Sequence, residues 1–291
     1  MRVMVTGGTG FVGVALRQAL AQAGHDVVLV TRRPASGDAA VSWEALPQAV
    51  AGMDAVVHLA GAPIAAGRWT PAQKAAIRDS RVDTTRAIVR ALAASPVRPQ
   101  VLVSASAIGF YGPHGDEPLD EDVPAGAGFL ADVCRAWEDA TRDAESLGVR
   151  VVRVRLGVVL AAGGGALGAM LPPFRFGLGG PLGGGRQWTS WIHRDDVVAL
   201  VLAALGDATW CGAVNATAPH PVTNATFARA LGRVLRRPAV LPVPAFVLRL
   251  LVGEMATMLL TGQRVLPAVA TAHGFVFRFP DLDAALADCL V

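Results

Sequence analysis

A glycine-rich segment near the start of the chain has the residue types and the spacing that bind a diphosphate group. The segment Val3-Met-Val-Thr-Gly-Gly-Thr-Gly-Phe-Val-Gly13 contains both GxGxxG and GxxGxxG. Such glycines permit a tight turn and a close approach of the backbone to the phosphates, and the free N–H groups of the following helix bind the anion. Because a β-branched strand precedes the turn and a predicted helix follows it, we favour a dinucleotide site over an ordinary glycine-rich turn. The residues predicted to bind the dinucleotide here are Gly7, Gly10, Phe11, Val12 and Gly13.

Two arginines at the end of the second predicted strand indicate which dinucleotide is bound. An NAD-specific protein usually has an acidic residue there, which binds the ribose hydroxyls. This chain has Arg32 and Arg33 instead, and a guanidinium group donates paired, charge-assisted hydrogen bonds to a phosphate. The pair therefore predicts a 2′-phosphate and the cofactor NADP(H). The alternative is a solvated arginine pair on the surface.

The elements that position these residues follow from the pattern of apolar residues. Apolar runs of strand length are expected at residues 3–6, 26–31, 55–59, 100–104 and 149–156. Stretches of helical period lie between them, from residue 11 and at 82–94 and 131–146. This alternation predicts an α/β fold with a doubly wound parallel sheet of the Rossmann type. We expect a cofactor domain over 1–160, with 186–215 returning to it, and a smaller C-terminal substrate lobe over 161–185 and 216–291.

Composition excludes several classes of function. Of the 291 residues, 53% are hydrophobic and 17% charged, which is typical of a globular α/β protein. The formal charge is only +3, with 25 dispersed arginines and one lysine, so we expect no nucleic-acid partner. Three cysteines and six histidines show no metal-ligand spacing, which predicts no metal and a reducing, cytoplasmic setting. We expect a monomer or homodimer that binds a small-molecule substrate.

Two apolar stretches could suggest a membrane protein. Residues 156–174 form an uncharged run of spanning length, but Gly163-Gly-Gly165 and Pro172-Pro173 indicate a strand end followed by a loop. Residues 245–260 include two charged residues at a period compatible with an amphipathic helix packed on the protein. We therefore expect no membrane association.

Short motifs follow one another along almost the whole chain. They are TGGTGFVG at 6–13, His58-Leu-Ala-Gly61, Arg68-Trp-Thr70, Ser80-Arg81, SASAIGFYG at 104–112, Leu171-Pro-Pro-Phe174, Gly185-Arg-Gln-Trp188 and WIHRDD at 191–196. In this order they resemble the extended short-chain dehydrogenase/reductase superfamily, and more narrowly its atypical epimerase-like family, whose members are often labelled sugar-nucleotide epimerases. The resemblance implies that the cofactor site is also lined by Leu59, Ala60, Gly61 and Ser104.

The superfamily resemblance also implies a serine and a YxxxK pair, in which Tyr is the acid/base and Lys lowers its pKa. The only tyrosine here is Tyr111 and the only lysine is Lys74, so the chain has no such pair. By the spacing to Glu138, Leu130 stands at the Tyr position and Cys134 at the Lys position. We expect Cys134 to be a small buried helix residue rather than a reactive thiolate.

Ser106 best matches the superfamily's serine, with Ser104 as the neighbouring alternative. Tyr111 lies in the turn beside the expected active site. Without a nearby cation its pKa would stay near ~10, so it would donate a hydrogen bond rather than act as a base at neutral pH. We predict catalytic roles for Ser106 and Tyr111, and a positioning or packing role is the alternative for Tyr111. Arg81 departs from the pattern, because related proteins often have Asn there.

The remaining polar candidates lie in the C-terminal part and at one strand end. Arg186, between glycines and Trp188, suits an anion, so both residues are predicted to bind substrate. The pair Asp195-Asp196 is expected to cap the helix that follows, and His193 to complete a hydrogen-bond network in the same loop. His58 is expected to pack at its strand end.

Two functional hypotheses follow. The first is an NADP(H)-dependent epimerase, reductase or dehydratase that acts on a hydroxyl or carbonyl of a small polar substrate, such as a nucleotide-linked sugar. The fold and the serine support it. The second is an NADP(H)-binding sensor or regulatory protein on the same fold, since chemistry depends on the site and not on the sheet. The missing Tyr–Lys pair supports that alternative.

Overall fold

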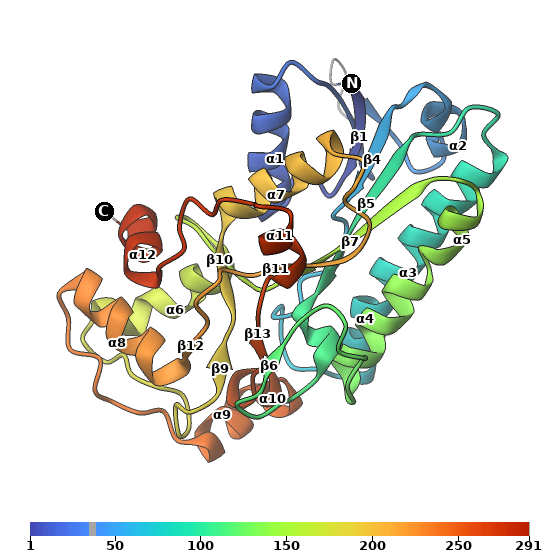
Figure 1. Cartoon of the computed structure of the whole chain (residues 1–291). Helices are drawn as coiled ribbons and strands as arrows, with labels where there is room; N and C mark the ends of the chain where they lie inside the picture. The colour runs from blue at the N-terminus through green and yellow to red at the C-terminus, as the bar shows by residue number, and fades with distance from the viewer. Residues whose placement is uncertain (35–38, 291) are drawn as a thin grey trace.

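The computed structural model describes residues 1–34 and 39–290, and its centre is a seven-stranded parallel sheet (Figure 1). The strand order is β11-β7-β5-β4-β1-β2-β3, so the chain winds outward from β1 in both directions. The strands are β1 (Arg2–Thr6), β2 (Asp26–Val30), β3 (Ala40–Val41), β4 (Ala55–His58), β5 (Val101–Ala107), β7 (Arg150–Leu156) and β11 (Gly212–Ala216). The predicted α/β, doubly wound fold class is confirmed.

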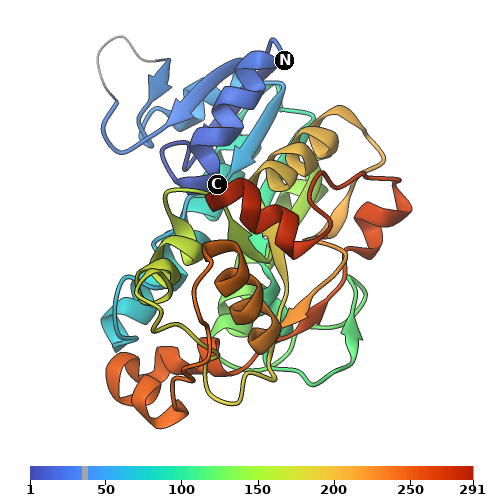
Figure 2. The same cartoon turned by 90° about the vertical axis from the view of Figure 1, so that its left-hand side faces the viewer.

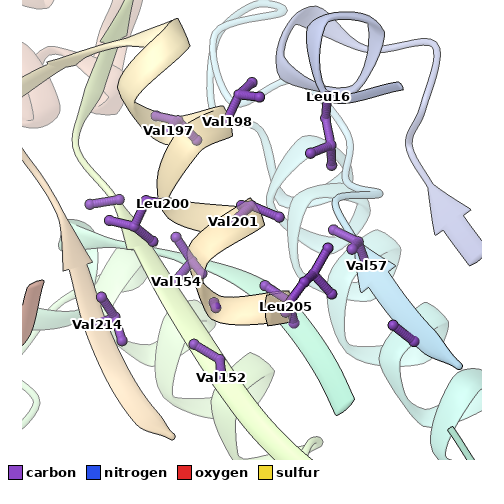
Figure 3. Packing of buried hydrophobic residues seen from close by; sticks show 14 of the residues in the cluster. Leu16, Val57, Val152, Val154, Val197, Val198, Leu200, Val201, Leu205 and Val214 are labelled. Carbon is purple, nitrogen blue, oxygen red and sulfur yellow. The ribbon is translucent and has the colours of Figure 1, made fainter. Parts of the chain in front are cut away.

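Helices cover both faces of this sheet, as Figure 1 shows. One face carries α1 (Phe11–Gln22), α7 (Arg194–Gly206) and α11 (Ala268–Ala272). The other carries α2 (Leu46–Ala49), α3 (Pro71–Ala94), α4 (Phe129–Asp139) and α5 (Arg142–Ser146). Successive strand side chains alternate between the faces. Figure 3 shows the packing on the first face, where Leu200 of α7 lies beside Val154 of β7 and Leu205 lies on the side of Val57 of β4.

A second apolar core lies outside the sheet and is built mainly by the C-terminal part of the chain (Figure 2). Its helices are α6 (Gly165–Arg175), α8 (Asn224–Leu235) and α12 (Leu282–Leu290). Two short strand pairs accompany it: β8 (Val158–Leu160) with β10 (Trp191–His193), and β9 (Trp188–Thr189) with β12 (Val222–Thr223). A third pair, β6 (Pro118–Leu119) with β13 (Arg264–Val265), packs with Tyr111 in a separate small cluster. The other helices are α9 (Ala245–Val252) and α10 (Ala256–Leu260).

Helix α6 corrects the expectation of a loop before residue 174. Pro172 and Pro173 lie inside this helix and remove two backbone donors from it. Leu167, Leu171 and Phe174 nevertheless recur at helical spacing and are all buried in the second core. The burial of these three side chains stabilises the helix more than the two missing backbone hydrogen bonds destabilise it. The spacing of the apolar residues therefore indicated the structure of this segment better than the prolines did.

Other element boundaries also differ from the sequence prediction. Helix α3 begins at Pro71, well before residue 82, because Thr70 caps it by accepting a bond from the Gln73 N–H at 3.2 Å. The helix expected at 131–146 is divided into α4 and α5.

The cap of α7 is His193, whose Nδ1 accepts from the Asp195 N–H at 3.2 Å, so the expected Asp195-Asp196 cap is wrong. The Asp196 carboxylate instead accepts the backbone N–H groups of Arg278 and Phe279 at 2.7 and 3.0 Å. Its role is to attach the segment before α12 to the start of α7.

The apolar stretch 245–260 forms two short helices joined by a turn, not one amphipathic helix. Leu248 and Met255 are buried, whereas Phe246, Leu250 and Leu251 are exposed. In the part of the chain that the structure describes, no helix combines the length and the apolar character needed to cross a membrane.

Candidate cofactor and active site

The glycine turn connects β1 to α1 at the carboxyl edge of the sheet, and its close contacts require glycine. Gly7 has a positive φ of 70°, and a Cβ there would lie 2.6 Å from the Leu59 carbonyl carbon. A Cβ on Gly13 would lie 2.2 Å from the Gly7 carbonyl oxygen. Both positions therefore exclude a side chain, and the turn packs directly against the segment after β4.

The start of α1 offers donors for an anion. Gly10 is the N-cap, and no side chain caps the helix. The N–H groups of the first turn have no acceptor within a helix, and the first turn contains no acidic residue. A Cβ on Gly10 would meet only the Gly7 oxygen, at 3.1 Å, so its outer side is open. This cradle fits the diphosphate of a dinucleotide.

A buried hydrogen-bond chain holds the segment Leu59-Ala-Gly61 beside that turn. The Thr6 hydroxyl bonds the His58 ring at 2.6 Å, and the opposite ring nitrogen bonds Thr85 of α3 at 3.0 Å. Thr6 also accepts the Ala60 N–H at 3.3 Å. Burial lowers the pKa of His58 to about 4, so the ring is neutral at physiological pH. His58 therefore packs at its strand end, as expected, and in addition connects β1, β4 and α3.

The predicted phosphate-binding arginines lie beyond β2. Arg32 and Arg33 are both exposed, and because β2 is parallel to β1 they lie at the same edge as the glycine turn. The four residues that follow Pro34 are outside the described residues. The geometry thus brings the arginine pair and the glycine turn to neighbouring strand ends.

Ser106 and Tyr111 lie in one buried polar cluster around Arg155 of β7. Arg155 donates two bonds to the Glu138 carboxylate, at 2.9 and 3.0 Å, and a third to the Tyr111 hydroxyl at 2.9 Å. Ser106 donates to the same carboxylate at 2.6 Å, and Tyr111 donates to the Asn215 side-chain oxygen at 2.8 Å. The cluster joins β5, β7, β11 and α4 beneath the carboxyl edge.

This arrangement bears on the two predicted catalytic residues. Each hydroxyl has one proton, and both protons are donated to protein acceptors. A cation does lie beside Tyr111, contrary to our expectation, but burial outweighs it and raises the pKa of the phenol to about 12. Donation to a substrate oxygen would require these bonds to break, so the catalytic roles of Ser106 and Tyr111 stay predictions.

On α4, uncharged side chains occupy the two positions at which the superfamily has its Tyr–Lys pair. Leu130 and Cys134 both face Gly109, where a Cβ would lie 3.2 Å from the Leu130 Cβ and 3.6 Å from the Cys134 sulfur. Burial raises the pKa of Cys134 to about 12, so it is an uncharged thiol. Arg81 of α3 lies nearby: a Cβ on Gly61 would be 3.1 Å from its Cζ, and its guanidinium lies 5.2 Å from the Trp137 ring centroid.

The other predicted site residues are more scattered. Ser104 is 1% exposed and donates to the Ala105 carbonyl oxygen at 3.3 Å, so it lies inside the sheet. Arg186 is exposed just before β9. Trp188 donates to Asp116 at 2.8 Å, and the Arg264 guanidinium lies 4.8 Å from its ring centroid.

Sequence reasoning did not identify the partners in the buried cluster. A signal for Arg155 was present, because a charged residue in an otherwise apolar central strand needs a counterion when buried. Glu138 served only as a spacing marker, and no role was predicted for Asn215. Their contact with Arg155 and Tyr111 depends on tertiary structure that spacing does not reveal.

Comparisons with known proteins agree with this geometry. The model of the NAD dependent epimerase/dehydratase family matches residues 3–212, and that of a domain of unknown function (DUF1731) matches residues 243–289. The human "Epimerase family protein SDR39U1" is 41% identical over 293 residues, covering 98% of each chain. A Bacillus subtilis relative, "Epimerase family protein YfhF", is 37% identical over 299 residues, covering 100% of this chain and 98% of its own. An Arabidopsis thaliana relative at 43% identity is named chloroplastic, so our cytoplasmic expectation stays a prediction.

Two solved structures are similar along the whole chain. The crystal structure of human epimerase family protein SDR39U1 (isoform2) with NADPH superposes with a TM-score of 0.93, at 39% identity and 99% coverage of both chains. A nucleoside-diphosphate sugar epimerase from Corynebacterium glutamicum gives 0.80 at 36% identity, covering 100% of this chain and 58% of its own. The NADPH in the human structure agrees with the predicted cofactor, and the resemblance noted from the motifs is confirmed. The chain belongs to the NAD dependent epimerase/dehydratase family.

Proposed function

We propose that this chain binds NADP(H) across the carboxyl edge of its sheet and acts on a hydroxyl or carbonyl of a small polar substrate. The observation that carries the proposal is the glycine cradle at the start of α1, whose contacts at Gly7 and Gly13 leave no room for side chains. The human relative crystallised with NADPH supports the choice of nucleotide. When bound, the nicotinamide cofactor supplies or accepts a hydride.

The residues of the chain have distinct roles in this proposal. The N–H groups at the start of α1 donate to the diphosphate, and Arg32 and Arg33 hold the 2′-phosphate through charge-assisted bonds. The segment Leu59-Ala-Gly61 lies beside the cofactor between its diphosphate and the active site. Arg186 and Trp188 are the candidates for contact with the substrate.

A titration of NADPH and NADH against the protein, followed by cofactor fluorescence, tests the nucleotide site. We expect NADPH to bind at least ~10-fold more tightly, since two guanidinium contacts to one phosphate exceed about 1.4 kcal/mol. The double variant Arg32→Ala/Arg33→Ala should lose this preference. The matched control is Arg236→Ala/Arg237→Ala, which removes another exposed arginine pair, just after α8. Equal affinities in the wild type would overturn the phosphate assignment.

A second candidate is a non-catalytic NADP(H)-binding sensor. The observation that favours it is the buried cluster, in which Ser106 and Tyr111 donate their protons to protein acceptors. Turnover with a panel of carbonyl compounds and nucleotide sugars, followed at the absorbance band of the reduced nicotinamide, separates the two functions. If Ser106→Ala and Tyr111→Phe lower kcat at unchanged NADPH affinity, the enzyme is supported. If no member of the panel reacts although NADPH binds, the sensor is supported.

A further inference from the structure

Arg81 is a buried cation that has no carboxylate partner among the residues that the structure describes. The residue is 8% exposed, and within the described residues its one hydrogen-bond acceptor is the Ile77 carbonyl oxygen, at 2.9 Å. No carboxylate in that part of the chain forms an ion pair with it, and burial lowers its pKa. A guanidinium group nevertheless keeps its charge in proteins. Burying a charge without a carboxylate partner is costly, and the Trp137 ring, whose centroid lies 5.2 Å from the guanidinium carbon, offsets only part of that cost. The contacts within the fold therefore do not account for this buried cation.

The order of the strands places Arg81 at one end of the dinucleotide site. The diphosphate cradle follows β1, and Arg32 and Arg33 follow β2 on one side of it. A nucleotide that extends from β2 across β1 continues over the ends of β4 and β5 on the other side. Gly61, just after β4, is exposed, and the Arg81 guanidinium packs against it. The nicotinamide half of the cofactor would therefore lie next to Arg81.

Arg81 is also a cation at this end whose charge no described carboxylate neutralises. Arg155 is nearby in the fold but forms a bidentate pair with Glu138. Cys134, which stands where the superfamily has its lysine, is buried and uncharged. An oxidised nicotinamide ring carries a positive charge, whereas the reduced ring is neutral. A fixed cation in a partly desolvated site therefore repels the oxidised form and leaves the reduced form unaffected.

We propose that Arg81 positions the nicotinamide half of the cofactor and makes the protein bind NADPH in preference to NADP⁺. The inference rests on the proposed nucleotide site and adds to it a selection between the two redox states. The protein then holds the reduced cofactor and releases the oxidised one. Such a preference suits a reductase that exchanges NADP⁺ for NADPH after each turnover, and it equally suits a sensor of the NADPH concentration.

The test is a comparison of dissociation constants for NADPH and NADP⁺, measured by calorimetry on the full chain. We expect the ratio of Kd for NADP⁺ to Kd for NADPH to fall by about tenfold in Arg81→Met, equivalent to about 1.4 kcal/mol of charge repulsion. Arg81→Lys keeps the charge and should retain most of the ratio. The control Arg135→Met removes an exposed arginine from α4 and should leave the ratio unchanged.

The outcomes separate this inference from the function on which it rests. A wild type that binds neither nucleotide would overturn the proposed function itself. Normal binding with the same ratio in wild type and Arg81→Met would overturn only the role of Arg81. Circular dichroism checks the fold of each variant. If Arg81→Met does not fold, Arg81→Gln removes the charge but keeps a hydrogen-bond donor, and the same ratio decides.

Discussion

Replacing Arg155 by methionine should destabilise the protein strongly, because it leaves a buried carboxylate without its cation. The Arg155 and Glu138 side chains are 5% and 10% exposed, and two hydrogen bonds join them. Removing one partner of such a buried pair costs about 3–5 kcal/mol, because the other charge stays buried. The Tyr111 hydroxyl loses a donor as well. At roughly 2–4 °C per kcal/mol for a chain of this size, Tm should fall by about 6–20 °C.

The assay is urea and thermal unfolding followed by circular dichroism, with Arg153→Met as the matched control. Arg153 lies on the same strand and its side chain is 13% exposed, but its partner Glu145 is 46% exposed. Its loss leaves a carboxylate that water can solvate, so Arg153→Met should cost less than Arg155→Met. The double variant Arg155→Met/Glu138→Met removes both charges and should recover much of the loss. If Arg155→Met costs no more than Arg153→Met, the cluster does not hold the four elements together as we infer.

Three further outcomes can be measured directly. Gly10→Val should keep the fold and lose NADPH binding, because the new side chain fills only the outer side of the turn. Gly13→Ala should lose binding and also lower Tm, because its Cβ would collide with the backbone. Equal Tm values in the two variants would contradict this reasoning. Burial lowers the pKa of His58 from 6.5 to about 4, so the unfolded chain binds a proton on this ring more readily than the folded chain. The free energy of unfolding should therefore fall by about 3 kcal/mol as pH drops from 6.5 to 4. His58→Gln should not show this part of the pH dependence. Iodoacetamide at pH 8 should modify the exposed Cys211 in the native protein but not Cys134, whose pKa burial raises to about 12; mass spectrometry of native and unfolded samples decides it.

Local sequence signals predicted most of the sheet and the nucleotide turn, because neighbouring residues determine them. The glycine turn needs only a strand, a helix and glycines in a short segment. The β-branched runs of β1, β4 and β7 are long enough to be recognised alone. Helix α6 was missed because glycine and proline were given more weight than the spacing of its buried apolar residues.

The active site was harder to predict, because its geometry depends on distant residues. Ser106 and Tyr111 were identified by motif, yet their acceptors Glu138 and Asn215 lie 32 and 104 residues away along the chain. No periodicity brings such residues together. Burial raises the pKa of Tyr111 to about 12. The sequence order indicated neither this burial nor the position of Arg155 beside the phenol.

The position of α7 has a consequence for how the protein is made. This helix covers the same sheet face as α1, and Figure 3 shows its Leu200 beside Val154 of β7. During synthesis β1, β4, β5 and β7 leave the ribosome before α7 does, so the part of this apolar face that α7 covers is exposed for that interval. Exposed apolar surface on parallel strands promotes aggregation and chaperone binding. Helix α1, which begins at the glycine turn and is synthesised first, therefore gains its neighbour α7 only after that interval.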